Sequence, residues 1–297
     1  MKTLFYEIDR DRPDPRIMEA AADIIRRGGL VAFPTETVYG LGANGLDAAA
    51  VARIFAAKGR PADNPLILHI ADREELEEWV AAVPDWLEPL LEQFWPGPFT
   101  VVLPRSDTVP DIVTAGLDTV AVRLPSLGAA RELIRAAGVP IAAPSANLSG
   151  RPSPTTAAAV MADMEGRIDM VLDAGPCEVG LESTVLDCVS QPPTILRPGG
   201  VTQEMLEAKL SQVRTAGRHS VDDTTTPRAP GMKYRHYAPA APLVLFPAGN
   251  SAEWGILVQR MNQAVMAALR QGKTVGAMVS SELAGLLPAG GNLGGCG

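Results

Sequence analysis

The stretch DPRIMEAAADIIRRGGLVAF (residues 14–33) contains the repeating unit of the fold. Its apolar side chains recur at helical spacing over residues 15–27, with Asp14 placed to cap the first turn and Gly28 to end the helix. The short apolar run Leu30–Phe33 that follows is typical of a buried strand. The stretch therefore predicts a helix followed by a strand, the unit from which α/β proteins are built.

Helical and strand patterns continue to alternate along the chain. Helices are predicted over residues 47–58, from residue 72, and over residues 126–137 and 203–210. Strands are predicted over residues 66–70, 100–103, 120–124, 140–143, 170–172, 184–186 and 194–196. The last three strands follow one another without predicted helices, which favours an antiparallel portion. We therefore expect an α/β fold with a mixed sheet.

The composition limits the class of protein. The 297 residues include 26 basic and 34 acidic side chains, a formal net charge of −8, which argues against a dedicated nucleic-acid binder. Hydrophobic residues make up 46% of the chain, enough for a large core and too many for a disordered protein. The sequence lacks an uncharged apolar run of about 18 residues, so no membrane span is predicted. Acidic residues follow Met1 too closely for a signal peptide, and we expect a cytoplasmic protein.

The periodicity changes after the first two thirds of the chain. Residues 1–212 carry the alternating pattern and form the first predicted domain. Residues 213–242 lose apolar periodicity, are rich in proline, and hold five cations against two carboxylates, which predicts a linker. Residues 243–297 begin a second, thin α/β unit, with strands predicted at 243–246 and 275–279 around a helix at 256–269.

Polar motifs follow several of the predicted strands. PTETVYGLG (residues 34–42) offers the hydroxyls of Thr35 and Thr37 beside two glycines, at the strand end where α/β sheets usually bind ligands. Lys58 and Arg60 flank Gly59 and suit a polyphosphate. An ordinary polar turn explains the first motif equally well, and a cationic helix end capped by glycine explains the second.

Further polar residues stand at other strand ends. The segment 144–151 contains Ser145 and Asn147, which suit phosphate, ribose or carboxylate but are also common in turns. Arg123 ends an apolar strand and needs a ligand or a structural ion pair. His69 alone resembles a core histidine more than a catalytic one. Because the sequence lacks Walker and dinucleotide loops, these residues by themselves predict only a cationic, hydroxyl-rich cleft for an anionic small molecule.

Six motifs, taken in order, resemble the YrdC-like family, and within it the long, two-domain threonylcarbamoyl-AMP synthases. They occupy residues 34–42, 58–69, 145–147, 182–185, 197–199 and 230–239. The resemblance implies a twisted open mixed sheet with helices, a linker that folds over the cleft as a lid, and a small Rossmann-like C-terminal unit that ends early in this chain.

The resemblance also implies a reaction. L-threonine, bicarbonate and ATP would give threonylcarbamoyl-adenylate and pyrophosphate, and a partner threonylcarbamoyl transferase complex would carry the group to transfer RNA. Mg²⁺ would be held by the ATP phosphates and not by a protein metal site. The implied catalytic residues are Lys58 and Arg60, acting as a phosphate clamp. The implied ATP-binding residues are Lys58, Arg60, Asn64, Thr119, Ser145, Asn147, Ser153, Arg197, Tyr234 and His236. The implied L-threonine-binding residues are Thr35, Thr37, His69, Arg123, Ala143 and Ser183.

Two other functions fit parts of the same pattern. An RNA-binding or ribosome-assembly module would need a broad basic surface, which the charge of −8 disfavours, so direct RNA binding is expected to be weak. A related carbamoyl-adenylate-forming domain serves hydrogenase maturation, but in that family acylphosphatase and zinc-finger segments precede it, and this sequence shows neither.

Overall fold

The computed structural model describes residues 2–216, 241–247 and 253–280. Two compact units are distinguished, Met1–Ala238 and Pro239–Gly297, and each is described by itself. The predicted linker, residues 213–242, lies mostly outside the described residues, and the division into three regions stays a prediction. Among the described residues, no helix combines the length and apolar character needed to cross a bilayer.

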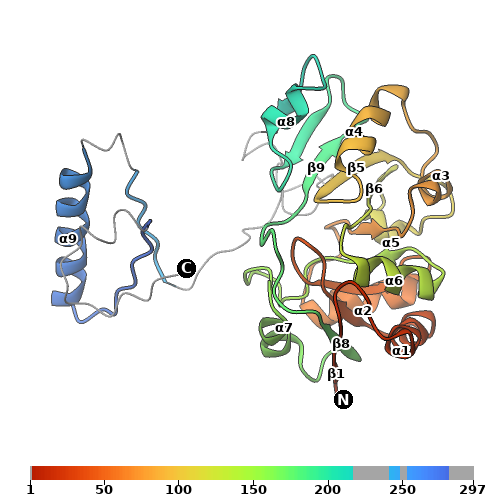
Figure 1. Ribbon diagram of the computed structural model, residues 1–297, viewed down its shortest axis with the longest axis horizontal. Coiled ribbons are helices and arrows are strands. Elements are labelled where there is room, and N and C mark those ends of the chain that lie inside the picture. Colours follow the sequence, from red (N-terminus) through yellow and green to blue (C-terminus); the bar gives the residue numbers. More distant parts are fainter. Residues whose placement is uncertain (1, 217–240, 248–252, 281–297) are drawn as a thin grey trace. The chain divides into compact units, whose positions relative to one another are not determined.

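An open sheet of eleven strands organises the first unit (Figure 1). From edge to edge the strands are β1 (Leu4–Glu7), β8 (Met170–Asp173), β2 (Val31–Phe33), β3 (Gly40–Asn44), β7 (Ile141–Ala142), β4 (Ile67–His69), β6 (Thr119–Arg123), β5 (Phe99–Pro104), β9 (Thr184–Asp187), β10 (Thr194–Arg197) and β11 (Arg214–Thr215). Parallel pairs, such as β4 with β6, occur beside antiparallel pairs, such as β5 with β6. The predicted α/β fold with a mixed sheet is therefore confirmed.

Helices cover both faces of this sheet. They are α1 (Pro15–Arg26), α2 (Ala48–Lys58), α3 (Leu76–Trp79), α4 (Glu88–Phe94), α5 (Asp111–Thr114), α6 (Gly128–Ala137), α7 (Ala157–Met164) and α8 (Gln203–Glu207), with single 3₁₀ turns at Arg73–Glu75 and Asp85–Leu87. On β2, Val31 and Phe33 join the apolar cluster under α1 and α6, whereas Ala32 joins the cluster under α2 on the opposite face. Because both faces are covered, the strand has a continuous apolar sequence instead of an alternating one.

Asp14 and Gly59 cap helices as predicted, and Asp47, predicted as the first residue of a helix, is its N-terminal cap. The Asp14 carboxylate accepts a hydrogen bond from the Arg16 N–H at 2.8 Å at the start of α1, and Asp47 accepts from the Ala49 N–H at 2.9 Å at the start of α2. Gly59 closes α2 with a φ of 62°, a left-handed conformation that glycine adopts without strain. The predicted helices at 15–27 and 47–58 are thus confirmed to within one residue at each end.

The strand prediction needs several corrections, because β1, β3 and β11 were missed and β8 was expected in another part of the sheet. Residues 170–172 were expected beside the other two late strands, but β8 lies between β1 and β2 and is parallel to both. Only β9 and β10 form the expected antiparallel pair, because the connection of residues 174–183 carries the chain from one part of the sheet to another. β3 was missed because it begins at Gly40, inside a motif whose glycines are typical of a loop.

The second unit contains α9 (Trp254–Arg270), which confirms the helix predicted at 256–269. The strands predicted at 243–246 and 275–279 are not formed, since the described residues on either side of α9 have no regular secondary structure. Leu243 and Leu245 are 83% and 82% exposed, so this apolar run has no strand partner among the described residues to bury it. Within that part of the chain, the Rossmann-like unit is not observed.

Candidate functional site

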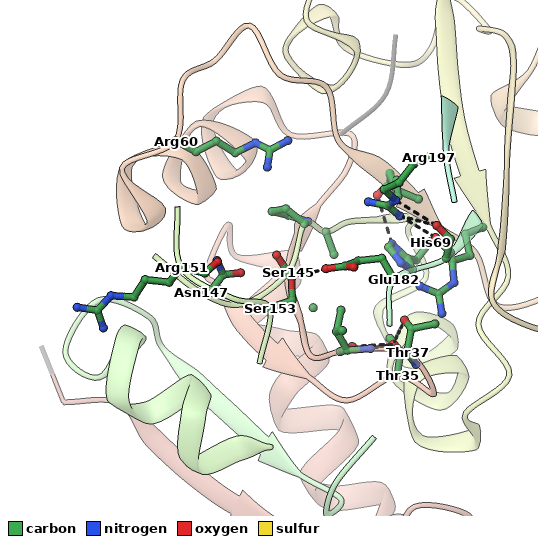
Figure 2. A pocket seen from close by; sticks show the side chains of 17 residues that line it. Thr35, Thr37, Arg60, His69, Ser145, Asn147, Arg151, Ser153, Glu182 and Arg197 are labelled. Atoms are coloured by element: carbon green, nitrogen blue, oxygen red, sulfur yellow. Dashed lines mark hydrogen bonds between the residues drawn. The ribbon is translucent and has the colours of Figure 1, made fainter. Parts of the chain in front are cut away.

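A cleft that is partly open to solvent lies in the first unit (Figure 2). Its walls come from the loop after β2, from β4, from the ends of β6 and β10, and from the segments that follow β7 and precede β9. The lining residues are Thr35, Thr37, Val38, Gly40, Arg60, Ile67, His69, Arg123, Ala143, Pro144, Ser145, Asn147, Arg151, Ser153, Glu182, Ser183 and Arg197. Segments far apart in the sequence therefore meet in one site.

Most of the residues predicted to bind substrates line this cleft. They are Thr35, Thr37, Arg60, His69, Arg123, Ala143, Ser145, Asn147, Ser153, Ser183 and Arg197. Lys58, Asn64 and Thr119 do not line it. Tyr234 and His236 lie outside the described residues, so their predicted contacts with the nucleotide stay predictions.

A tight turn after β2 presents two hydroxyls to the cleft. The Thr35 hydroxyl donates to the Val38 carbonyl at 2.7 Å and lies 2.9 Å from the Thr37 hydroxyl. Alternate residues of the turn point in different directions, so Thr35 and Thr37 line the cleft and the side chain of Glu36 lies buried behind it. The turn needs a short hydroxyl side chain at Thr35 to bond its own backbone.

His69 contributes a neutral imidazole. Burial, reinforced by the charge of Arg123, lowers the pKa of His69 to about 3. The Nδ1 atom lies 3.2 Å from the Ile67 carbonyl, and the Ile141 carbonyl also hydrogen-bonds the ring. Because carbonyl oxygens only accept, the N–H of the neutral ring is directed toward these backbone carbonyls.

Arg123 and Ser183 lie near His69. Arg123 is the register partner of His69 across β4 and β6, and of Thr100 across β6 and β5. The Thr100 and Ser183 hydroxyls are 2.7 Å apart, and Arg197 Nη2 donates to the Ser183 hydroxyl at 3.0 Å and to its carbonyl at 2.9 Å. This arrangement brings two guanidinium groups and a hydroxyl together, as recognition of a carboxylate requires.

A second group of polar residues lies at the other end of the cleft. In Figure 2, Arg60, Arg151 and Asn147 lie on one side and Arg197 and His69 on the other, with Glu182 and Ser153 between them. Arg60 Nη2 donates to the Asn64 carbonyl at 3.3 Å and the Pro65 carbonyl at 3.1 Å, which holds the guanidinium against its own loop. Cations therefore lie at both ends of the cleft, and this distribution of charge suits an extended anion.

Three predicted residues are placed differently. Thr119 begins β6, at the opposite end of that strand from Arg123. Asn64 is buried, and its Oδ1 has no hydrogen-bond partner among the described residues. Lys58 is 3% exposed, and its ammonium group donates to the Ser145 carbonyl and, at 2.6 Å, to the Asn147 carbonyl. Burial and the neighbouring charge of Arg60 lower the pKa of Lys58 to about 7. Lys58 therefore lies beneath the loop that lines the cleft.

Two charged lining residues were not predicted as site residues. Arg151 stands four residues after Asn147 in a motif that the sequence singles out, and Glu182 directly precedes Ser183. The Ser153 hydroxyl donates to Glu182 Oε1 at 2.5 Å. Their neighbours in the sequence were the available signal, but a carboxylate is unexpected in a cleft for anions. Among the described residues, no cluster of three or more potential metal-ligating side chains is present.

Comparisons with known proteins agree on one family. Residues 23–199 match the Sua5/YciO/YrdC family, described as "Telomere recombination", and residues 201–290 match "Threonylcarbamoyl-AMP synthase, C-terminal domain". The chain is 52% identical over 236 residues to the threonylcarbamoyl-AMP synthase of Pyrococcus abyssi, covering 80% of this chain and 69% of the relative. It is 48% identical over 277 residues to that of Bacillus subtilis, covering 93% and 77%.

Structural similarity leads to the same group. The crystal structure of P. abyssi Sua5 complexed with L-threonine superposes with a TM-score of 0.87 at 45% identity, covering 94% of this chain and 82% of that one. The family match spans the strands and loops that form the cleft, and the second match covers the region after them. The chain therefore belongs to the Sua5/YciO/YrdC family, among the long, two-domain threonylcarbamoyl-AMP synthases.

Proposed function

We propose that this chain forms L-threonylcarbamoyladenylate and pyrophosphate from L-threonine, bicarbonate and ATP. The observation that carries the proposal is a single cleft in which a neutral histidine and a guanidinium at one end face cations and hydroxyls at the other. Such a cleft suits two anionic substrates that must be held together against their mutual repulsion. Its relatives of similar length are threonylcarbamoyl-AMP synthases.

L-threonine is assigned to the end that contains His69 and Arg123. The Arg123 guanidinium suits the amino-acid carboxylate, and the neutral imidazole of His69 suits the threonine hydroxyl or ammonium group. Four further residues complete the proposed threonine site, and all of them line the cleft: Thr35, Thr37, Ala143 and Ser183. The P. abyssi relative was crystallised with L-threonine, which is consistent with an amino-acid site in this cleft.

ATP is assigned to the opposite end. Arg60 is the proposed cation for the phosphates, with Arg197 nearer the threonine end. The further ATP-binding residues proposed are Lys58, Asn64, Thr119, Ser145, Asn147, Ser153, Tyr234 and His236. Of these, Ser145, Asn147 and Ser153 have the support of lining the cleft, and Lys58 has the support of holding the backbone of Ser145 and Asn147.

The chemistry requires two bond-forming steps. The deprotonated threonine amine attacks bicarbonate and releases water, which gives a carbamate. A carbamate oxygen then attacks the α-phosphorus of ATP and displaces pyrophosphate. Arg60 would stabilise the charge that develops on the phosphates, and the walls of the cleft would limit access of water to the adenylate.

Mg²⁺ fits the donor set as a companion of ATP. The described residues contain no cluster of three potential metal ligands, and Glu182 is the carboxylate among the described lining residues. This suits an ion held by phosphate oxygens and water, with at most one carboxylate from the protein. When bound, the ion would neutralise phosphate charge during displacement of pyrophosphate.

The product is a mixed anhydride that water hydrolyses, so it must pass to a second enzyme. We propose a threonylcarbamoyl transferase complex acting on transfer RNA as that partner, with only weak direct RNA binding by this chain. A net charge of −8 supports assigning RNA binding to the partner complex, because binding to the phosphate backbone depends on a broad basic surface.

The decisive experiment measures pyrophosphate release with ATP, bicarbonate and each amino acid in turn. Release should require bicarbonate and be fastest with L-threonine. Serine, which lacks only the methyl group, is the matched control and should be a poorer substrate. Amino-acid-independent release, or equal rates with all amino acids, would contradict the proposed function.

A further inference from the structure

Glu36 and Arg123 form a buried ion pair behind the cleft. Arg123 Nη2 lies 2.6 Å from Glu36 Oε1, and both side chains are 5% exposed. Arg123 lines the cleft, whereas Glu36 does not. Removing two charges from water is costly unless their geometry is good and their other polar atoms are satisfied. The pair is therefore stable in this position only if the other polar atoms of both side chains also have partners.

Each partner is held on more than one side. Glu36 Oε2 accepts a hydrogen bond from the Ser126 N–H at 3.2 Å, and Arg123 Nε donates to the Gly97 carbonyl at 3.3 Å. A guanidinium has five N–H donors. Among the described residues, Arg123 uses one donor on Glu36 and one on Gly97, so three remain for a ligand in the cleft.

The backbone fixes Glu36 as firmly as its side chain. The turn made by Thr35 directs Glu36 away from the cleft, and the Glu36 carbonyl accepts a hydrogen bond from the Val179 N–H at 2.9 Å. Glu36 thus joins the loop after β2 to the end of β6, the segment before α6 and the segment before β9. A residue held at these points can set the direction of Arg123 without touching a ligand.

We propose that Glu36 is a positioning residue for the L-threonine carboxylate. It holds Arg123 in the one orientation that leaves the remaining donors facing the cleft. It also compensates the charge of Arg123, so that this end of the cleft favours a carboxylate with one charge over a polyphosphate. This inference rests on the proposed function, because it assigns a role in binding one of the proposed substrates.

The first test is steady-state kinetics of Glu36→Gln. The amide keeps the size of the side chain but removes the charge that holds Arg123. We expect the KM for L-threonine to rise about tenfold or more, with kcat and the KM for ATP changed by less than about threefold. Equal losses for both substrates would indicate general damage to the cleft and would overturn the inference.

The second test asks whether Glu36 acts through Arg123. Calorimetry would measure L-threonine binding to Arg123→Met and to the double variant Glu36→Gln/Arg123→Met. The double variant removes both buried charges, so it leaves no unpaired charge in the interior. If Glu36 acts through Arg123, adding Glu36→Gln to Arg123→Met leaves the threonine Kd unchanged. A clear further rise in the threonine Kd of the double variant would overturn the inference, and this comparison holds even if Glu36→Gln alone folds poorly, because it does not use that single variant.

Two controls separate this inference from the proposed function. Asp72→Asn breaks an ion-paired cluster with Arg131 and Arg135 outside the cleft and should leave both KM values unchanged. Wild-type enzyme is measured in the same series. Wild-type turnover that is independent of threonine would count against the proposed function, whereas threonine-dependent turnover unaltered by Glu36→Gln would count against the positioning role alone.

Discussion

Lys58 shows how burial changes the task of a single side chain. Its position beside Arg60 predicts a phosphate clamp, yet its ammonium group bonds the carbonyls of Ser145 and Asn147. The Ser149 N–H also donates to the Lys58 carbonyl at 2.9 Å, so side chain and backbone both hold this loop. Lys58 can therefore act on a ligand through the placement of Ser145 and Asn147.

Replacement of Lys58 by methionine should separate the two roles. We expect Lys58→Met to lower pyrophosphate release by about two orders of magnitude, because a displacement of Ser145 and Asn147 by about 1 Å can cost that much. Amide hydrogen exchange over residues 145–149 should become faster, because two carbonyls lose their donor. Arg60→Ala is the matched comparison and should lower the rate to a similar extent without faster exchange in that loop. Unchanged exchange in Lys58→Met would show that the lysine does not hold the loop.

His69 should make stability depend on pH. Its pKa is about 3 in the folded protein, against an ordinary value of 6.5. Below pH 6.5 the unfolded chain binds a proton at His69 that the folded protein does not bind. The contribution of neutral His69 to the free energy of unfolding is therefore fully present above pH 6.5 and is lost as the pH falls toward 3. When the pH is lowered from 7 to 4.5, the free energy of unfolding of His69→Gln should fall by roughly 2 kcal/mol less than that of the wild type. Urea titrations at both pH values provide the measurement, and parallel losses would contradict it.

At the level of the elements, the turn after β10 packs unusually close to the segment before β9. A Cβ atom on Gly199 would lie 2.2 Å from the Glu182 carbonyl oxygen and 2.4 Å from the Thr184 nitrogen. Both are backbone atoms of the segment that brings Glu182 and Ser183 to the cleft. Only glycine allows this approach without displacing that segment.

Gly199→Ala should therefore damage both stability and activity. We expect an unfolding free energy lower by about 1–3 kcal/mol, the usual cost of overpacking, together with slower pyrophosphate release. Gly255→Ala is the matched control, because a Cβ there meets no atom within 4 Å and the residue lies in α9. Thermal melting and turnover of the two variants give the comparison. A Gly199→Ala protein as stable and active as wild type would show that the close approach is unimportant.

The sequence predicted the elements where local signals were strong. Asp14 and Asp47 cap α1 and α2, and the apolar run of β2 is complete within a few residues, so short-range patterns suffice. β3 and the placement of β8 depend instead on pairing with distant strands, which local patterns do not encode.

The candidate site divides in the same way. Hydroxyls and cations such as Thr35 and Arg60 could be predicted because they stand in motifs at strand and helix ends. The burial of Lys58 and the pairing of Glu36 with Arg123 could not, because each depends on a contact across 87 or more residues. The family resemblance supplied residue roles, and the structure supplied the orientation of the side chains.

For the whole molecule, the described cleft belongs entirely to the first unit. All its described lining residues, and β11 at the edge of the sheet, lie before residue 217. A chain ending at Ala216 should therefore fold cooperatively and bind L-threonine. If residues 213–242 act as the lid that the family resemblance implies, the shortened chain, which keeps only residues 213–216 of this segment, should lose much of its ATP-dependent turnover. Calorimetric threonine binding and pyrophosphate release distinguish these effects, and unchanged turnover would remove the lid hypothesis.

The order of strands also affects when the protein can fold during synthesis. β8 lies between β1 and β2, so residues 170–173 supply the strand that joins two elements from the first 33 residues. During synthesis, β1 has no strand partner until residues 170–173 have emerged, because β8 is the strand with which it pairs. Among the described strands, β1 is therefore made first and is among the last to be paired.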